Sequence, residues 1–280
     1  QPFFNVINGG VHADSGIDVQ EFLITPVKRE SFRDGLEKIA NIYHTLKKIL
    51  ADKGLETAVG DEGGFAPKLG STENAIATLY QAIESAGYVP GEEIAIAIDP
   101  ASSEFYDDKE KVYRFEGQKL TSKELLTYYE NLVEKYPALI SIEDGFSEHD
   151  WEGFAAQTKA QGQKIQLVGD DIFVTNPEIF KEGIKKGVAN AILIKLNQIG
   201  TVTEAIEAIS LARKAGYKTM ISHRSGETVD SYIADFAVAM HAGQIKTGSM
   251  ARSERVEKYN QFLRIEEELG KDVALASFPG

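Results

Sequence analysis

The sequence contains no cysteine among its 280 residues. Disulfide bonds, thiolate metal sites and a nucleophilic cysteine are therefore excluded, and the absence fits a reducing compartment such as the cytoplasm. No apolar run approaches the roughly 20 residues that a membrane-spanning helix requires. No secretory signal is visible, and the chain begins at Gln1 rather than at methionine. We therefore expect a fragment or a processed product.

Positive charge is scarce relative to negative charge. The 30 lysines and arginines are outnumbered by 43 aspartates and glutamates, which leaves a formal net charge of −13. A chain with this charge repels nucleic acid and anionic membranes at long range, so we expect no direct nucleic-acid partner. An anionic substrate would need metal ions or clustered lysines and arginines for its recognition.

Short apolar runs alternate with amphipathic stretches in the last two thirds of the chain. The apolar runs lie at 94–98, 139–142, 165–168, 191–194, 219–221 and 244–245. Helices are expected at 121–136, 151–161, 176–187, 201–215, 228–241 and 253–269. Continuous apolar runs suit strands that are buried on both faces, and the alternation of strand and helix is typical of a parallel sheet.

The first third of the chain departs from this alternation. Two strand-like runs at 3–7 and 22–25 come first, and two long helical stretches at 31–52 and 72–86 follow. With the six later runs they make eight strands, the number that closes an α/β barrel. We expect one barrel domain over 1–280 with no internal boundary, because this length suits a single α/β barrel.

An ionisable residue comes at the end of six consecutive apolar runs. These residues are Asp99, Glu143 with Asp144, Asp170 with Asp171, Lys195, His223 with Arg224, and Lys246. In a parallel barrel the carboxyl ends of the strands lie on one rim, where such barrels place their active sites. A single charge after a strand is usually a solvated loop residue, but six in succession are hard to obtain by chance.

The signs of these charges indicate a kind of chemistry. Three adjacent strand ends carry acids, and a hard divalent cation would relieve their repulsion; oxygen ligands without cysteine favour Mg²⁺ over Zn²⁺. Lys195 lies beside the acids, and a lysine near cations loses proton affinity and can act as a general base. A base with magnesium can remove a proton next to a carboxylate, because the metal stabilises the ene-diolate. Arg224, Lys246 and the backbone of Ser225 are candidates for holding a phosphate.

Several motifs resemble those of the enolase family, in the family's order and over nearly the whole chain. They are NGGVH at 8–12, QEF at 20–22, VGDEGG at 59–64, SIED at 141–144, GDD at 169–171, LIKLNQIG at 193–200, SHRSGE at 222–227 and QIKTG at 244–248. Gly145 and Gly169 resemble the bacterial variants of these motifs. The resemblance implies a TIM-like ββαα(βα)6 barrel with an antiparallel second strand. That strand would bring Gln20 and Glu21 to the mouth, and Glu62 would reach in from the loop between the two long helices.

The resemblance also implies an activity and roles for individual residues. The chain would be the barrel of a lyase that dehydrates 2-phospho-D-glycerate to phosphoenolpyruvate, a reversible step of glycolysis. The first of two Mg²⁺ ions would bind Asp99, Glu143 and Asp170. Lys195 would take the C2 proton, while Glu62, assisted by Glu21, would protonate the departing C3 hydroxyl. Substrate contacts would come from His12, Gln20, Glu21, His223, Arg224, Ser225 and Lys246.

The resemblance further implies parts that these 280 residues do not contain. Family members carry a separate N-terminal capping domain, whose mobile loop supplies a serine ligand to the second magnesium and closes over the substrate. Without it, the barrel is expected to hold the first magnesium but to turn over slowly or not at all. The whole protein would be a homo-oligomer, a dimer or higher.

Two alternatives stay open. A racemase, cycloisomerase or acid-sugar dehydratase of the same superfamily would share the three carboxylates, but these often have Lys-x-Lys where this chain has QEF at 20–22. A binding protein is the other alternative, because the charged segment 105–113 resembles one through which some bacterial enolases bind plasminogen. Such enolases are displayed at the cell surface or secreted. We expect the segment to be an exposed, hairpin-like loop, with Lys109 and Lys111 as its contact residues.

Overall fold

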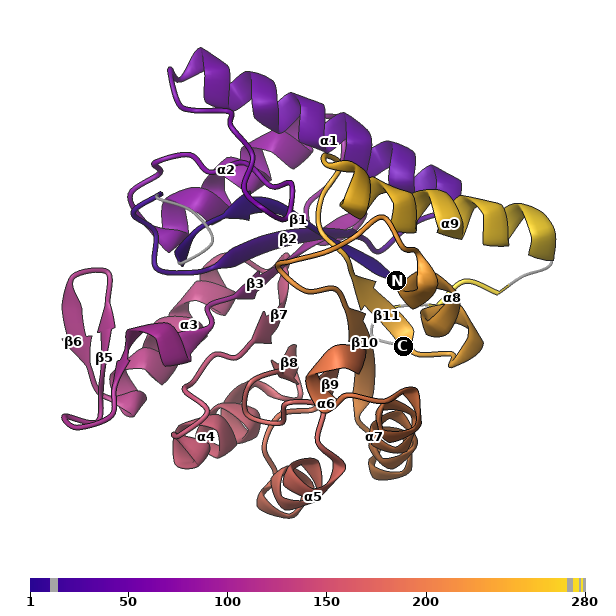
Figure 1. Ribbon diagram of the computed structural model, residues 1–280. Helices are drawn as coiled ribbons and strands as arrows, with labels where there is room; N and C mark the ends of the chain where they lie inside the picture. Colours follow the sequence, from indigo (N-terminus) through magenta and orange to yellow (C-terminus); the bar gives the residue numbers. More distant parts are fainter. Residues whose placement is uncertain (11–14, 271–273, 277, 279–280) are drawn as a thin grey trace.

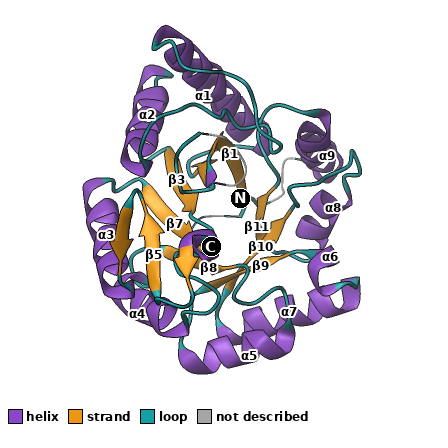
Figure 2. Ribbon diagram, turned by 60° about the vertical axis from the view of Figure 1, so that its left-hand side comes forward, coloured by secondary structure: helices purple, strands orange, loops and turns teal. Residues whose placement is uncertain are grey.

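The computed structural model describes residues 1–10, 15–270, 274–276 and 278. Eight strands close into a barrel, in the neighbour order β1-β11-β10-β9-β8-β7-β3-β2, and Figure 2 shows the helices arranged around them. These strands are Pro2–Asn8 (β1), Glu21–Pro26 (β2), Ile94–Asp99 (β3), Leu139–Glu143 (β7), Gln166–Gly169 (β8), Ala191–Ile194 (β9), Lys218–Ser222 (β10) and Gly243–Lys246 (β11). The predicted α/β barrel is confirmed.

The second strand runs against its neighbours. β2 pairs antiparallel with β1 and with β3, whereas the other neighbouring pairs of the barrel are parallel. Glu21, the first residue of β2, pairs with Asp99, the last residue of β3. The start of β2 therefore lies at the carboxyl ends of the other strands. The prediction that an antiparallel second strand brings Glu21 to the mouth is confirmed.

The helices lie close to their predicted positions. They are Phe32–Asp52 (α1), Thr72–Ser85 (α2), Ser122–Lys135 (α3), Trp151–Gln161 (α4), Pro177–Lys186 (α5), Val202–Ala215 (α7), Tyr232–Ala239 (α8) and Ser253–Leu269 (α9). α8 is shorter than the predicted 228–241, and the carbonyl of Thr228 accepts a hydrogen bond from Lys258 instead of a helical N–H. The short helix Leu196–Ile199 (α6) was not predicted. Among the described residues, none of the helices has the length and apolar character to cross a membrane.

Side chains cap several of these helices. Ser31, Ser71, Asp150 and Thr201 each accept a hydrogen bond from a backbone N–H in the first turn of the helix that follows. Asn176 caps α5 in the same way and is followed by Pro177, which suits a first helical position. These local signals explain why the starts of the helices are legible in the sequence.

The interior of the barrel is a packed core rather than a channel. Phe3, Leu23, Val168, Leu193 and Met220 belong to an inner apolar cluster that is separate from the larger core between strands and helices. Side chains of β8 and β11 meet across the interior, where Gln166 and Gln244 exchange hydrogen bonds of 2.9 and 2.7 Å. Burial on both faces explains why these strands are unbroken apolar runs in the sequence.

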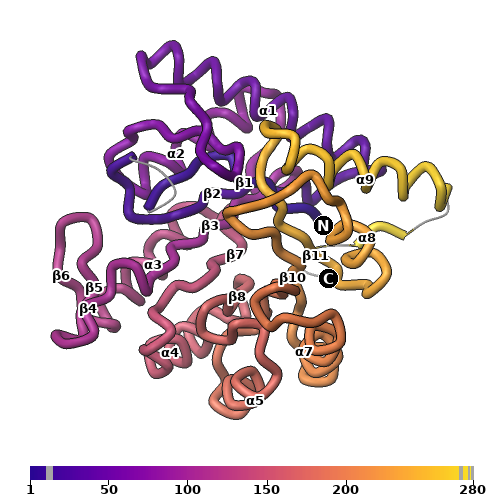
Figure 3. The backbone as a smooth tube through the Cα atoms, viewed as in Figure 1, coloured from indigo at the N-terminus to yellow at the C-terminus, as the bar shows by residue number. Residues whose placement is uncertain are grey.

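The first and the last helix lie side by side (Figures 1 and 3). Phe32 at the start of α1 stacks on Phe262 of α9, with ring centroids 5.0 Å apart. The Glu266 carboxylate accepts the backbone N–H of Arg33 at 3.1 Å, so it also neutralises the positive end of the α1 dipole. These contacts join helices from opposite ends of the chain into one ring around the barrel.

A small antiparallel sheet is inserted between β3 and α3. Its strands are Tyr106–Asp107 (β4), Val112–Phe115 (β5) and Gln118–Leu120 (β6), and Figure 1 shows them projecting from the barrel. The predicted hairpin over 105–113 is confirmed, with its tip at 108–111 exposed, whereas Tyr113 is buried. Its charges largely pair with one another, as Lys111 does with Asp108 and Arg114 with Asp107.

Candidate active site

The carboxyl ends of the strands surround a polar pocket of about 300 Å³. Sequence-predicted residues that line it are Gln20, Glu21, Glu62, Asp99, Asp170, Lys195, His223, Arg224, Ser225 and Lys246. Glu143 is buried beside them and lies 2.7 Å from the ammonium of Lys246. His12 lies outside the described residues. The barrel thus brings together acids and bases that are far apart in the sequence.

Lys246 is buried among three carboxylates. Its Nζ lies 2.7 Å from Glu143, 3.1 Å from Asp99 and 3.3 Å from Glu21. Burial alone would lower the pKa of this lysine, but the attraction of the carboxylates outweighs burial and raises the pKa well above its usual range. One ammonium therefore serves as the shared counter-ion of three acids.

A single ammonium does not neutralise this group. Burial, followed by the negative charge of Asp99, raises the pKa of Glu143 well above its usual range. Burial also opposes ionisation of Asp99, yet the Lys246 charge and hydrogen bonds to the carboxylate outweigh it and lower the pKa of Asp99. Neighbouring carboxyls whose pKa values are driven apart share a proton instead of both ionising. The cluster thus has an excess of acid over base.

A second group of acids surrounds the end of β8. The Asp144 carboxylate accepts the backbone N–H groups of Asp170 at 2.9 Å and Asp171 at 2.8 Å, which fixes the turn that carries both residues. Burial and the charges of Asp170 and Asp171 raise the pKa of Asp144 well above its usual range. Burial and Asp170 raise the pKa of Asp171 to about 6. Sequence analysis noted Asp144 as a strand-end acid but missed its positioning role.

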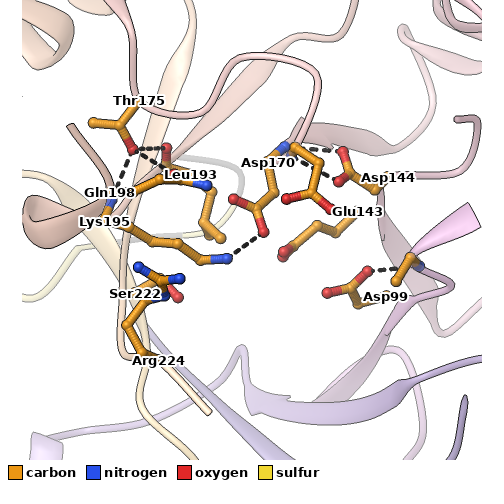
Figure 4. Close-up of polar contacts among 12 residues, drawn as sticks. Asp99, Glu143, Asp144, Asp170, Thr175, Leu193, Lys195, Gln198, Ser222 and Arg224 are labelled. Atoms are coloured by element: carbon orange, nitrogen blue, oxygen red, sulfur yellow. Dashed lines mark hydrogen bonds and ion pairs between the residues drawn. The ribbon is translucent and has the colours of Figure 1, made fainter. Parts of the chain in front are cut away.

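These acids fit a hard divalent cation. Oδ1 of Asp170 is buried without a hydrogen-bond partner among the described residues. Ligand oxygens of Asp144, Asp170 and Asp171 lie within 4.8 Å of one another. Figure 4 shows the carboxylates of Asp99, Glu143 and Asp170 directed toward a common space. An all-oxygen donor set of this kind is typical of Mg²⁺, Ca²⁺ or Mn²⁺ sites.

Lys195 extends from the end of β9 toward Asp170 (Figure 4). Its Nζ forms an ion pair with Oδ2 of Asp170, and its backbone N–H donates to Oγ1 of Thr175 at 2.9 Å. Burial opposes the charge of the lysine, but the attraction of Asp170 outweighs burial and raises the pKa of Lys195. The lowered proton affinity expected of a lysine beside cations stays a prediction; in the chain by itself the charge nearest to the ammonium is the carboxylate of Asp170.

Glu62 enters the pocket from the loop between α1 and α2, as predicted. The Asn5 amide donates to its Oε2 at 2.6 Å, and the loop binds to the barrel through a 2.8 Å bond from the Ser249 N–H to the Glu62 carbonyl. Gly63 has a φ of +82°, and a Cβ there would lie 2.5 Å from the Ala251 carbonyl oxygen. Glycine is therefore required at this turn. Asn5 was missed, because in the sequence it is an ordinary polar residue within a strand.

A loop after β10 carries the last group of predicted residues. His223 is buried, and its Nε2 lies 3.5 Å from Oε1 of Glu62. The Arg224 guanidinium donates to Oδ1 of Asn197 at 3.0 Å. A buried arginine of α9, Arg255, donates to the carbonyls of Arg224 and Ser225. Nothing in the local sequence pattern indicated that Arg255 belongs to the site.

A closed α/β barrel with one antiparallel strand and a mouth of buried carboxylates and lysines defines an enolase-type barrel. The family described as "Enolase, C-terminal TIM barrel domain" matches residues 1–278, and the chain belongs to this family. The assignment sets aside the racemase, cycloisomerase and acid-sugar dehydratase alternative.

The relatives are bacterial enolases. The chain is 97% identical over 269 residues to Enolase 1 of Lactococcus lactis subsp. cremoris, an alignment that covers 96% of this chain and 64% of that protein. It is 90% identical over 280 residues to the enolase of Streptococcus thermophilus, with 100% and 66% covered. Enolase 3 of Lactobacillus johnsonii is 59% identical over 279 residues, with 100% and 65% covered. The chain thus spans slightly less than two thirds of the length of these relatives.

Proposed function

We propose that this chain is the catalytic barrel of an enolase that dehydrates 2-phospho-D-glycerate to phosphoenolpyruvate, reversibly, in glycolysis. One observation carries the proposal. A lysine, Lys195, and a carboxylic acid, Glu62, line the same pocket as the buried acid cluster. Removing a proton from one carbon and hydroxide from the next requires a base and an acid in one site. The relatives whose names are enolase support this choice of substrate.

The residues of the chain divide the reaction between them. Lys195 takes the C2 proton, and Glu62, assisted by Glu21, protonates the departing C3 hydroxyl. The amide of Asn5 orients the Glu62 carboxyl for this transfer. Magnesium held by Asp99, Glu143 and Asp170, joined by a second ion during turnover, would stabilise the ene-diolate charge and offset the attraction of Asp170 for the Lys195 proton.

Substrate binding uses the cationic part of the pocket. Arg224 lies at its partly exposed edge, and Lys246 is buried in its interior. Ser225 and Gln20 also line the pocket. These residues, with His223 and His12, contact the phosphate and the carboxylate of the substrate. Bidentate donation by Arg224 suits a phosphate, whereas Lys246 acts as a point charge.

Magnesium binding by this chain is the first test. Isothermal titration calorimetry should detect Mg²⁺ binding that Asp99→Asn abolishes, because the substitution removes a ligand charge and leaves the shape of the side chain unchanged. Retained binding in Asp99→Asn would contradict the proposed carboxylate site.

Formation of phosphoenolpyruvate, followed by its absorbance, then tests the activity. Turnover would mean that the capping domain is dispensable, and its absence would assign the capping domain a closing role.

The same proposal includes a cellular compartment and an oligomeric state. We assign the activity to the cytoplasm, because a sequence without cysteine fits a reducing compartment. For the longer protein we propose a homo-oligomer, a dimer or higher, as the family resemblance implies.

A second candidate function is plasminogen binding by the hairpin at 105–113. Its exposed lysines favour contact with a lysine-binding pocket, although Lys111 already pairs with Asp108 at 2.7 Å. Such pairing is typical of a solvated surface loop, so the pocket carries the stronger proposal. A pull-down with plasminogen should show reduced capture when Lys109 and Lys111 are both changed to alanine. Undiminished capture would discard this segment and, with it, the cell-surface or secreted role.

A further inference from the structure

Arg255 is a buried cation next to the pocket, with only 1% of its surface exposed. Its guanidinium donates to the carbonyls of Ser225 at 2.7 Å, Arg224 at 2.8 Å and Asp61 at 3.0 Å. The first two carbonyls belong to the loop after β10, and the third to the loop that carries Glu62. One side chain of α9 therefore ties together two loops that supply site residues.

The space for this side chain is built into a third loop. Gly248 has a φ of +85°, and a Cβ at this position would lie 2.6 Å from Cδ of Arg255 and 2.7 Å from the Glu62 carbonyl oxygen. A larger residue would therefore displace either Arg255 or the Glu62 loop. The absence of a side chain at Gly248 thus leaves a defined space for the Arg255 side chain.

The guanidinium also contacts the imidazole of His223. Nη1 of Arg255 lies 2.6 Å from Nδ1 of His223. An arginine is always protonated in proteins and has donors but no acceptor. Nδ1 must therefore accept this hydrogen bond with its lone pair, and it cannot carry a proton. In a neutral imidazole the proton then resides on Nε2, which lies 3.5 Å from Oε1 of Glu62.

We propose that Arg255 is a positioning residue that fixes His223 as the neutral Nε2–H tautomer. His223 then presents a donor to Glu62 and to the pocket, while its basic nitrogen is occupied. Glu62 therefore faces the Nε2–H donor of His223, and the basic nitrogen of that ring is not available to take the proton of Glu62. The catalytic part of this inference rests on the proposed function, but the tautomer does not.

The tautomer can be observed directly. Long-range ¹H–¹⁵N correlation spectra of the full chain, labelled at its histidines, distinguish protonated from unprotonated ring nitrogens, and His223→Gln identifies the signal. At neutral pH we expect His223 to show an unprotonated Nδ1 and a protonated Nε2. A protonated Nδ1, a doubly protonated ring or a mixture of tautomers would overturn the proposal. This spectrum needs no variant of Arg255, so a folding defect cannot obscure it.

Variants test whether Arg255 is the cause. Arg255→Met should convert the single tautomer into a mixture and lower kcat by about tenfold or more with a smaller change in KM, because the Glu62 side of the pocket loses its alignment. Arg255→Lys should restore part of the single-tautomer population and part of kcat. Tyr259→Phe is the matched control, since it removes a buried hydrogen bond to the Gly248 carbonyl from the same helix without touching His223.

The outcomes separate the two proposals. An unchanged tautomer in folded Arg255→Met would refute the role of the arginine. The expected tautomer in a chain that converts no 2-phosphoglycerate, even when combined with its capping domain, would refute the proposed function and leave the arginine's role intact.

Discussion

Replacing Lys246 with methionine is expected to destabilise the metal-free chain by about 3–5 kcal/mol at neutral pH. Methionine has nearly the length of lysine, so packing changes little, but Glu21, Asp99 and Glu143 lose the ammonium that lies within 3.3 Å of each. Removing one partner from a buried ionic group leaves uncompensated charge in a medium of low dielectric constant. Urea unfolding in the presence of a chelator measures the loss.

The loss should become smaller as the pH falls. Without the ammonium, burial and their mutual repulsion should hold the folded-state pKa values of Asp99 and Glu143 above the unfolded values of about 4. A carboxyl whose pKa is raised by folding contributes fully to the stability of the folded state below its unfolded pKa. This contribution is lost as the pH rises through its folded-state pKa. Glu143 already has a raised pKa in the parent chain. The difference between Lys246→Met and the parent should therefore narrow from pH 7 toward pH 4.

Lys258→Met is the matched control for this prediction. Lys258 is equally buried, but it pairs with one partly exposed carboxylate, Glu227 at 3.0 Å, and with backbone carbonyls. Its loss of stability should depend less on pH, because Glu227 can turn toward solvent. A Lys246→Met variant that is destabilised equally at pH 4 and pH 7 would show that packing, not charge, is responsible.

Added Mg²⁺ provides a further measurement on the same variant. If the acids form a cation site, Mg²⁺ should stabilise Lys246→Met by more than it stabilises the parent chain.

Local patterns made most of the fold predictable. Six of the eight barrel strands, β3 and β7 to β11, are largely buried and end in an ionisable residue or are followed directly by one. Apolar runs followed by charges therefore mark both these strands and the rim, as Ile94–Asp99 illustrates. Helix starts were legible because capping depends on residues within one turn. α6 escaped prediction because a four-residue helix is too short to show a periodic pattern.

The supporting residues of the site were not predictable in this way. Asn5 contacts Glu62 across 57 positions of sequence, and Arg255 contacts His223 across 32. Neither contact leaves a local spacing pattern, because the barrel's closure alone brings the partners together. The direction in which the pKa of Lys195 shifts was not predictable for a related reason. It depends on which charge lies nearest, and in the chain by itself that charge is the carboxylate of Asp170.

Replacing Lys195, the proposed base, with arginine is expected to stop removal of the C2 proton while the rest of the site stays intact. Arginine preserves a cation opposite Asp170, so Mg²⁺ binding by calorimetry should remain close to that of the parent. Its guanidinium does not release a proton near neutral pH, so it cannot take one from C2. We expect kcat to fall by about 10²–10⁴-fold, the usual contribution of a general base. Exchange of the C2 hydrogen of 2-phosphoglycerate with deuterium oxide, followed by NMR, reports the affected step directly.

Glu62→Gln provides the complementary variant. Glutamine keeps an acceptor for the 2.6 Å hydrogen bond from Asn5 but has no acidic proton for the departing hydroxyl. This variant should retain C2 exchange while it loses the formation of phosphoenolpyruvate. If C2 exchange persists in Lys195→Arg, the base lies elsewhere in the pocket. If C2 exchange is lost in Glu62→Gln, proton removal and hydroxide departure are not separate steps. The two variants together therefore assign the base and the acid independently, because each removes one proton transfer and leaves the other measurable.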